Sequence, residues 1–193
     1  CEGKKALEMA LKVNKVKEVY SLEDLKLPKD INQYIVSEEI MKKISSSVTP
    51  EGIVFVSDFI ESKADYGNKI VYLDGVSDPG NMGTIIRTAL AFGSDGVFYS
   101  KGSVSLYNEK VVAASKGAIF LIPVIESELH VLKLKYQVIV SALEDNSISL
   151  KEVKPNNNFV LVLGNESHGV SKETLELADI VTKIPIQNID SLN

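Results

Sequence analysis

A polar segment from Asp74 to Arg87 follows an apolar run and opens a helical pattern, and it holds the first candidate for chemistry. A Pro-Gly pair marks a turn, and Asp78 or Asn81 is suited to cap the helix that follows. Arg87 is the one arginine among 21 basic residues, and its planar guanidinium forms forked hydrogen bonds that lysine cannot form. Gly83 leaves no side chain in the way, so we expect a ligand to approach the helix near Arg87. Because free N–H groups at a helix start favour an anion, the segment predicts a phosphate or ribose held between Asn81 and Arg87.

The alternative for this segment is an ordinary strand–turn–helix with a surface arginine. The sequence here contains neither G-x-G-x-x-G nor G-x-x-x-x-G-K-[ST]. Dinucleotide or nucleoside-triphosphate binding by those two mechanisms is therefore unsupported.

A second polar segment follows another apolar run, and in it Asn165 and Glu166 stand between Gly164 and Gly169. Polar side chains at the tip of a central strand are costly unless they are used. Glu166 is interpreted either as a functional residue or as a hydrogen-bonding group that pins the loop, and both interpretations stay open. His168 is expected to be a loop residue and not a catalytic base. A third segment, 184–193, ends a strand pattern at a proline and indicates little when taken alone.

A parallel sheet is the scaffold that would bring these segments together. Apolar runs are found at 69–74, 96–100, 119–125, 137–143, 158–163 and 180–184, with helical patterns at 82–92, 108–117 and 171–178. Continuous apolar strands that alternate with helices are typical of a parallel sheet covered on both faces. Ligands of such sheets bind at the carboxyl ends of the strands, which is where the polar segments begin.

The first 60 residues lack the regular strand–helix alternation of the rest. They show helical patterns at 3–13 and 37–46 and extended patterns at 16–20 and 52–56. We expect a small α/β domain over residues 1–60, a linker over 61–68 and a larger domain over 69–193. Several lysines lie mostly off the apolar face of the first helix, and they form either a solvated face or a set of phosphate contacts. They are Lys4, Lys5, Lys12, Lys15 and Lys17.

Composition excludes several classes of protein. The single cysteine, Cys1, excludes a disulfide scaffold and a multi-cysteine zinc site, and the two histidines lack metal-ligand spacing, so no metal is expected. No apolar run approaches the roughly 20 residues that a membrane span needs, and no signal-peptide pattern is present, so a cytoplasmic protein is expected. The net charge of −5 disfavours nucleic acid as a partner but says little about a local basic patch.

Taken in order, the three segments resemble the signature motifs of the SpoU/TrmH family of RNA 2′-O-ribose methyltransferases, in the SPOUT superfamily. Residues 74–93 are similar to the motif D-x-x-x-D-P-x-N-x-G-x-x-x-R-T-A-x-x-F-G, and residues 163–169 to L-G-x-E-x-x-G. The last segment is similar to I-P-[MI] followed by S-L-N. The resemblance covers nearly all of residues 69–193. Residues 2–60 more loosely resemble the family's ribosomal-protein-like substrate-binding domain.

The resemblance implies a knotted, parallel-sheet SPOUT methyltransferase domain that follows a small α/β RNA-binding domain. It implies S-adenosylmethionine as methyl donor, a homodimer as the active unit, and RNA as substrate, with ribosomal RNA favoured over transfer RNA. Members continue past Ser-Leu-Asn with a helix that threads the knot, and this sequence stops at Asn193. The site residues that the resemblance implies are Arg87, Asn81, Glu166, Ser191 and Asn193 for catalysis, and Gly164, Asn165, Ile184 and Leu192 for the donor. Under the same interpretation, Lys4, Lys5, Lys12 and Lys15 contact RNA.

Arg87 is an awkward general base because a guanidinium stays protonated, so we expect it to clamp a phosphate and stabilise the developing alkoxide. The proton acceptor stays open between the phosphate, water and Glu166. Two other interpretations compete with the enzyme: an RNA-binding or assembly protein without activity on the same fold, and a flavodoxin-like nucleotide binder.

Overall fold

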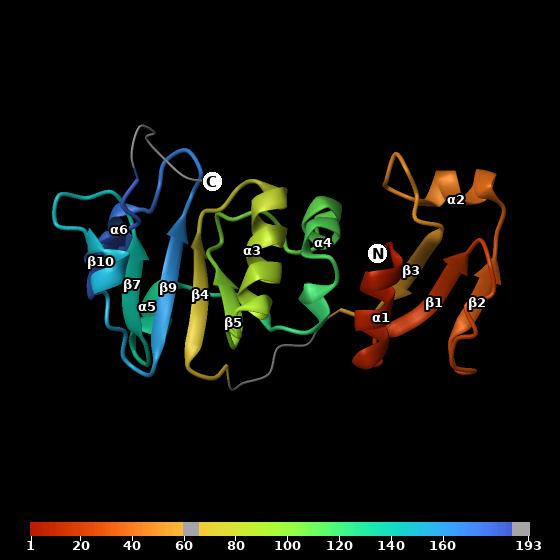
Figure 1. Ribbon diagram of the computed structural model, residues 1–193, viewed down its shortest axis with the longest axis horizontal. Coiled ribbons are helices and arrows are strands. Elements are labelled where there is room, and N and C mark those ends of the chain that lie inside the picture. The colour runs from red at the N-terminus through yellow and green to blue at the C-terminus, as the bar shows by residue number, and fades with distance from the viewer. Residues whose placement is uncertain (60–65, 187–193) are drawn as a thin grey trace.

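Two β-sheets form the frame of the protein. The computed structural model describes residues 1–59 and 66–186, and the smaller sheet lies within the first of these ranges. It has the strand order β2-β1-β3, from β1 (Val16–Ser21), β2 (Asn32–Ile35) and β3 (Ile53–Ser57). β1 runs parallel to β2 and antiparallel to β3. The helix α1 (Lys4–Lys12) packs against β1 and β3, and α2 (Glu38–Ile44) packs against β3 (Figure 1).

The larger sheet has seven strands in the order β6-β5-β4-β9-β7-β10-β8. Every recorded pairing between its strands is parallel, which confirms the predicted sheet. The strands are β4 (Lys69–Asp74), β5 (Gly96–Tyr99), β6 (Val124–Glu126), β7 (Gln137–Ser141), β8 (Ile148–Ser149), β9 (Phe159–Gly164) and β10 (Ile180–Lys183).

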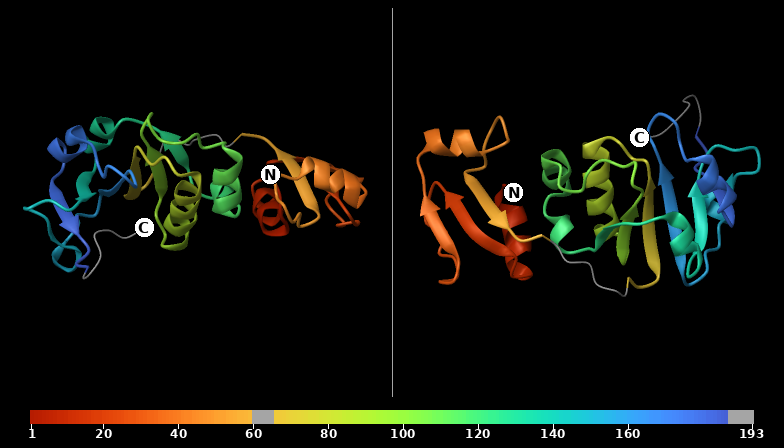
Figure 2. Two further views of the ribbon diagram at one scale, coloured as in Figure 1. Left: turned by 90° about the horizontal axis from the view of Figure 1, so that it is seen from above. Right: turned by 180° about the vertical axis from the view of Figure 1, so that it is seen from behind.

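Helices cover this sheet on both faces, as Figure 2 shows from above. On one face, Val71 and Leu73 of β4 share a core with Met82 and Ile86 of α3 (Pro79–Ala91). On the other face, Ile70 of the same strand shares a second core with residues of α5 (Leu129–Lys133). The remaining helices are α4 (Glu109–Ser115), α6 (Lys172–Glu176), and the short 3-10 turns η1 (Ala118–Phe120) and η2 (Leu150–Glu152).

The predicted strand over 119–125 is wrong over most of its length. Ala118–Phe120 form the 3-10 turn η1, and the strand β6 begins only at Val124. Ala118, Ile119 and Phe120 are all buried, and η1 contacts α1, α3 and α4. The run is apolar because it lies between helices, and not because it crosses the sheet. The extended strand β2 and the helix α5 were not predicted from the sequence.

The unit built on the small sheet contacts the unit built on the larger sheet through α1 and η1. A side chain at Gly117 would come within 2.9 Å of the Ala6 Cα atom, so the backbones approach closely there. The Phe55 and Phe120 rings, one from each part, have their centroids 6.1 Å apart. Among the described residues, no helix is long and apolar enough to cross a membrane.

Candidate active site

A cavity of about 1120 Å³ opens at the carboxyl ends of the central parallel strands. It lies between one face of α3 and the loops that follow β7 and β9. The lining comes from α3, from strands β4, β7, β9 and β10, and from the loop at 164–170. Its residues include Asn81, Thr84, Ile85, Thr88, Phe92, Glu144, Leu161, Leu163, Gly164, Asn165, Glu166, His168, Lys183, Ile184 and Ile186. Five of the residues implied by the resemblance therefore line one cavity: Asn81, Gly164, Asn165, Glu166 and Ile184.

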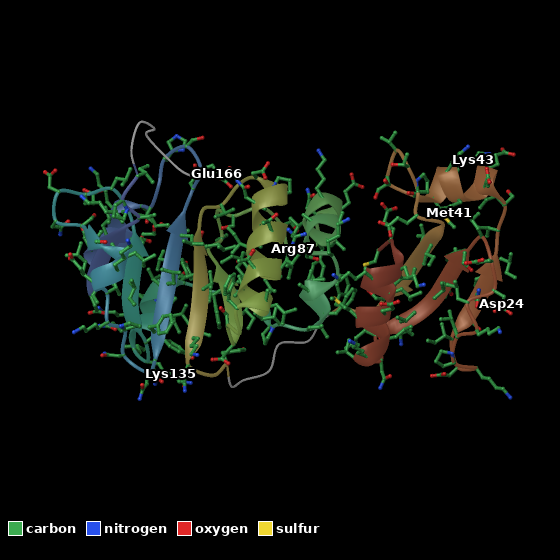
Figure 3. The ribbon with its side chains drawn as sticks, in the orientation of Figure 1. Asp24, Met41, Lys43, Arg87, Lys135 and Glu166 are labelled. Atoms are coloured by element: carbon green, nitrogen blue, oxygen red, sulfur yellow. The ribbon has the colours of Figure 1, made fainter. Side chains whose placement is uncertain are left out.

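Glu166 ties the two sides of this cavity together. One oxygen of its carboxylate accepts hydrogen bonds from the Ser77 backbone N–H at 3.2 Å and the Ser77 hydroxyl at 3.3 Å. The other accepts from the Asp78 backbone N–H at 3.3 Å and from Nδ2 of Asn81 at 3.0 Å. Figure 3 shows Glu166 at the carboxyl end of β9, beside the start of α3. The interpretation of Glu166 as a residue that pins the loop is consistent with these contacts.

The charge of Glu166 follows from the same contacts. Partial burial raises its pKa, but the hydrogen bonds from Asn81 and from backbone N–H groups outweigh burial, and the net pKa is lowered from its ordinary value of 4.5. A carboxylate with a lowered pKa and four donors around it is a weak proton acceptor at neutral pH. This arrangement fits a positioning role better than general-base catalysis.

Neighbouring contacts reinforce the link between the two loops. Nδ2 of Asn165 donates to the Gly75 carbonyl at 2.8 Å, and the Ser171 backbone N–H donates to the Asp74 carboxylate at 2.8 Å. Asp74 ends β4 and was not singled out from the sequence as a site residue, although it opens the first motif. Its position beside the end of β9 is a consequence of the sheet order, which the sequence pattern does not supply.

Gly164 is required by the tight return of its loop. Asn165 and Gly169 form a two-way backbone bridge, with N–O distances of 2.8 and 2.9 Å. A Cβ atom at Gly164 would lie 2.4 Å from the Gly169 carbonyl carbon. His168 lies in the same loop, where Nδ1 is 3.1 Å from Oδ1 of Asn165. The loop therefore presents backbone groups, and not bulky side chains, at the end of β9.

Asp78, one of the two capping candidates, caps α3, whereas the predicted Pro-Gly turn is wrong because Pro79 and Gly80 are the first residues of the helix. Oδ1 of Asp78 accepts the Asn81 backbone N–H at 2.7 Å, which leaves the Asn81 side chain free to donate to Glu166. Proline at the first helical position supports the same start. The helix begins a few residues earlier than the predicted range, 82–92.

The prediction that Gly83 leaves room for a ligand is wrong. A Cβ atom there would meet the Val111 carbonyl oxygen at 2.5 Å and the Ala114 Cβ atom at 2.6 Å. Gly83 is buried against α4, so its missing side chain allows two helices to pack closely. The space above Gly83 is filled by the protein itself.

Arg87 does not line the cavity of its own chain. It follows Asn81 by six positions, which rotates it by about 240° around α3 and moves it by about 9 Å along the axis. Its side chain is exposed and makes no hydrogen bond or ion pair with the described residues. Figure 3 shows Arg87 on the side of α3 that faces α4.

Of the remaining candidate residues, the four lysines lie in or beside α1, and three residues fall outside the described part of the chain. Ser191, Leu192 and Asn193 are outside the described residues. Lys4 and Lys5 begin α1, whereas Lys12 ends it, so they lie about 12 Å apart along the helix axis. Lys15 comes just before β1. Among the described residues, no group of three or more His, Cys, Asp or Glu side chains is arranged to hold a metal ion.

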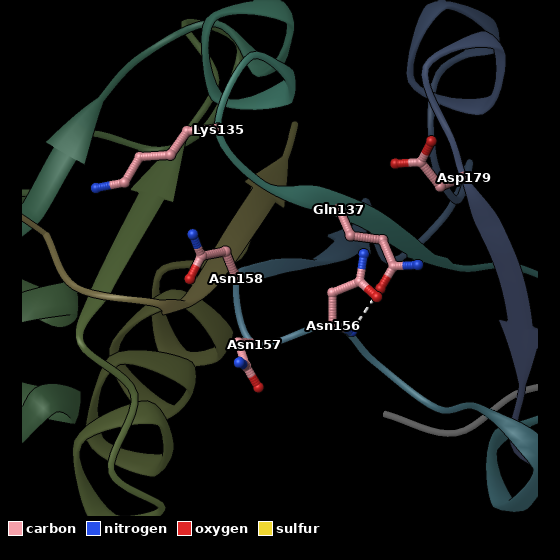
Figure 4. A pocket seen from close by; sticks show the side chains of 6 residues that line it. All are labelled: Lys135, Gln137, Asn156, Asn157, Asn158 and Asp179. Carbon is pink, nitrogen blue, oxygen red and sulfur yellow. Dashed lines mark hydrogen bonds between the residues drawn. The ribbon is translucent and has the colours of Figure 1, made fainter.

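A second hollow, of about 590 Å³, lies at the amino ends of strands β7, β9 and β10 (Figure 4). Its lining is polar and comes from Lys135, Gln137, Asn156, Asn157, Asn158 and Asp179. Several of these groups already bond to the protein: Gln137 accepts the Asn156 backbone N–H, and Asp179 accepts the Val138 backbone N–H and the Lys133 ammonium. None of the three sequence motifs contributes to it, so the cavity at the carboxyl edge is the candidate active site.

Comparison with known proteins shows the family to which the chain is related. The model of the SpoU rRNA Methylase family matches residues 68–193. The 23S rRNA (guanosine(2553)-2′-O)-methyltransferase RlmP of Bacillus subtilis (strain 168) is 34% identical over 203 aligned positions, which cover 100% of this chain and 82% of the relative.

Solved structures give the same result. The AdoMet-bound rRNA methyltransferase from Sinorhizobium meliloti is 27% identical, with a TM-score of 0.83 over 100% of this chain and 80% of that chain. A TrmH-family protein from Porphyromonas gingivalis is 30% identical, with a TM-score of 0.84 over 100% of this chain and 83% of that chain. The parallel sheet, the motif loops and these similarities confirm the resemblance seen in the sequence, and the chain belongs to the SpoU rRNA methylase family.

Proposed function

We propose that this protein transfers a methyl group from S-adenosylmethionine to a ribose 2′-hydroxyl of ribosomal RNA. The observation that carries the proposal is the cavity at the carboxyl edge of the sheet, in which Glu166 joins the first two family motifs. Ribosomal RNA is favoured over transfer RNA because the similar protein from B. subtilis is named for a 23S rRNA 2′-O-methyl transfer. A ribosomal substrate would place the protein in the cytoplasm.

The residues of the cavity fit the methyl donor. Its volume of about 1120 Å³ exceeds the roughly 300–1,000 Å³ of common ligand pockets, so there is room for a donor and part of an acceptor. The lining combines apolar side chains such as Ile85 and Leu161 with the polar groups of Glu144 and Lys183. Gly164, Asn165 and Ile184 are assigned to hold the donor, with Leu192 as a further contact. When bound, S-adenosylmethionine supplies the reactive methyl group, and the protein contributes alignment.

Asn81 and Glu166 position the loops, and Arg87 acts on the RNA. A permanently charged guanidinium is suited to clamp the phosphate beside the target ribose and to stabilise negative charge on the 2′-oxygen. Ser191 and Asn193 complete the assigned site. The phosphate or water remains as proton acceptor, because the lowered pKa of Glu166 makes its carboxylate a poor base.

We also propose that the active unit is a homodimer in which Arg87 serves the cavity of the partner chain. This is supported by the position of Arg87, which is exposed on a face of α3 that does not line its own cavity. Phe92 at the end of the same helix is 85% exposed, so an apolar surface is available there for a partner chain.

Complementation between two inactive variants tests the composite site. Arg87→Ala removes the guanidinium but keeps the cavity, whereas Gly164→Ala disturbs the cavity loop but keeps Arg87. When the two proteins are unfolded together, refolded and assayed with labelled donor on an unmodified 23S rRNA transcript, about a quarter of wild-type activity should return. Each variant refolded alone is the control. Activity that stays at the level of the single variants would contradict the shared site.

Mapping of 2′-O-methyl groups on cellular RNA, with and without the gene, tests the substrate. A methyl group lost from ribosomal RNA supports the proposal. A methyl group lost from transfer RNA would reassign the substrate, and an unchanged map together with intact RNA binding would indicate an assembly protein without activity.

A further inference from the structure

Two tyrosines form a stack on the small sheet, away from the candidate active site. The Tyr20 and Tyr34 ring centroids are 5.2 Å apart, and the ring planes differ by 19°. The two residues lie directly opposite each other on the parallel strands β1 and β2. The Tyr20 hydroxyl donates to the Glu18 carboxylate at 2.9 Å, which holds this ring in its orientation.

The stack lies on the face of the sheet that α1 does not cover. Val19 and Ser21, the neighbours of Tyr20 along β1, are fully buried, so Tyr20 itself points to the other face. The residue opposite Tyr20 on β3 is Val54, and Val56 on the same strand is 49% exposed. The helix α2 packs against β3.

One ring face of this stack is open. Within the described part of the chain, β2 is the edge strand of its sheet and no further strand pairs with it beyond Tyr34. Tyr34 uses one face of its ring against Tyr20, and its side chain is nevertheless 46% exposed. A flat aromatic group placed on the outer face would extend the existing stack by one layer.

The partner that fits this surface is an unpaired base of the RNA substrate. Sequence-tolerant stacking on exposed aromatic side chains is a general way in which proteins hold single-stranded nucleotides. The carboxylate of Glu18 beside the rings disfavours a phosphate there but leaves the π-face available. Lysines lie at one end of the same unit, where α1 ends and the two parallel strands begin: Lys12, Lys15 and Lys29 (Figure 1). They provide positive charge for the backbone that follows the base.

We propose that Tyr34, supported by Tyr20, is a stacking platform for an unpaired base of the RNA substrate. The platform fixes the RNA on the small sheet while the target ribose reaches the cavity of the larger sheet. This inference rests on the proposed role of residues 1–60 in RNA binding and assigns that role to a particular surface.

Substitution at position 34 tests the platform in the full-length chain. Tyr34→Ala should weaken binding of an unmodified 23S rRNA transcript by about 5- to 150-fold, the range expected for loss of one base–aromatic stack. Tyr34→Phe keeps the ring and should bind within about twofold of the wild type. Affinity for S-adenosylmethionine should not change in either variant. Equal RNA binding by the wild type and Tyr34→Ala would overturn the proposal.

A fluorescent variant reports stacking directly. The chain has no tryptophan, so Tyr34→Trp introduces a single indole reporter. Its emission should be quenched by oligoadenylate and by the 23S rRNA transcript but not by inorganic polyphosphate, which has charge but no bases. Leu134→Trp, at an 88% exposed position at the end of α5, is the matched control and should not be quenched. Emission of the Tyr34→Trp protein that RNA does not alter would refute the platform.

The two proposals fail in different ways. If the wild-type protein neither binds nor methylates ribosomal RNA, the proposed substrate is wrong, and the oligoadenylate measurement still decides the stacking platform. If the wild type methylates ribosomal RNA but the substitutions at position 34 show no change in RNA binding and no quenching, the platform alone is wrong.

Discussion

The exchange Glu166→Gln isolates the contribution of the charge that joins the two motif loops. The carboxylate accepts four hydrogen bonds, at 3.0–3.3 Å, from Ser77, Asp78 and Asn81. Glutamine has nearly the same shape but keeps only one oxygen. Its NH₂ group would face one pair of donors, so two of the four bonds become donor–donor contacts.

The size of the effect follows from the geometry. Hydrogen bonds to a charged group contribute about 1.5–3 kcal/mol each when well formed, but these are long and the side chain is exposed, so solvent screening reduces them. We expect Glu166→Gln to weaken the link between the loops by about 1–2 kcal/mol in total. Because the donor site needs both loops in place, affinity for S-adenosylmethionine should fall about 5- to 30-fold.

Isothermal titration calorimetry with S-adenosylmethionine measures this change, and Glu152→Gln, at an exposed carboxylate of η2, is the matched control. The pKa of Glu166 is lowered in the folded protein, so its contribution is present at neutral pH and is lost as the pH falls through the folded pKa, below 4.5. The difference between the wild type and Glu166→Gln should therefore shrink in acid. Equal donor affinity at pH 7, or a gap that widens in acid, would refute the role assigned to the carboxylate.

Two further predictions concern α3: the packing of Gly83 against α4 and the proposed phosphate clamp of Arg87. Gly83→Val should lower the free energy of unfolding by about 1–3 kcal/mol, measured by urea denaturation, because a Cβ atom would lie 2.5 Å from the backbone of α4. Gly102→Ala is its control, since the space around Gly102 is open, and equal losses in both variants would contradict the packing argument. Arg87→Lys should reduce kcat by about 10²-fold or more while donor affinity stays within about twofold, because lysine keeps the charge but loses the fork. Undiminished turnover in this variant would exclude a clamp that depends on two parallel hydrogen bonds.

The sequence predicted most of what local chemistry determines. Asp78 was one of two capping candidates, and its side chain accepts a backbone N–H at the start of α3. The apolar runs predicted the central strands because a strand covered on both faces is apolar at every position. The grouping of Asn81 and Glu166 followed from the rule that ligands bind at the carboxyl ends of parallel strands.

Features that depend on packing between distant segments could not be predicted from the sequence pattern. The run 119–125 was predicted as a strand because periodicity does not distinguish a buried strand from an apolar turn held between helices. The strand β2 was missed because its four residues are mostly exposed and show no alternation. Gly83 was interpreted as space for a ligand, since the sequence does not reveal which element will occupy that space. The network around Asp74 was likewise hidden, because it depends on β4 and β9 being neighbours.

The helix α3 explains why one short motif contains residues with such different surroundings. Asn81, Ile85 and Thr88 lie on the face that lines the cavity, whereas Gly83 lies on the face that packs against α4. Arg87 follows Gly83 by one helical turn on the side toward α4, yet its side chain is exposed. An exposed guanidinium at this position is available to a ligand from outside the chain, which is the role proposed for Arg87. In the proposed dimer, an RNA phosphate beside the donor cavity of a second copy would meet Arg87 where α3 already presents it, without any movement of the helix.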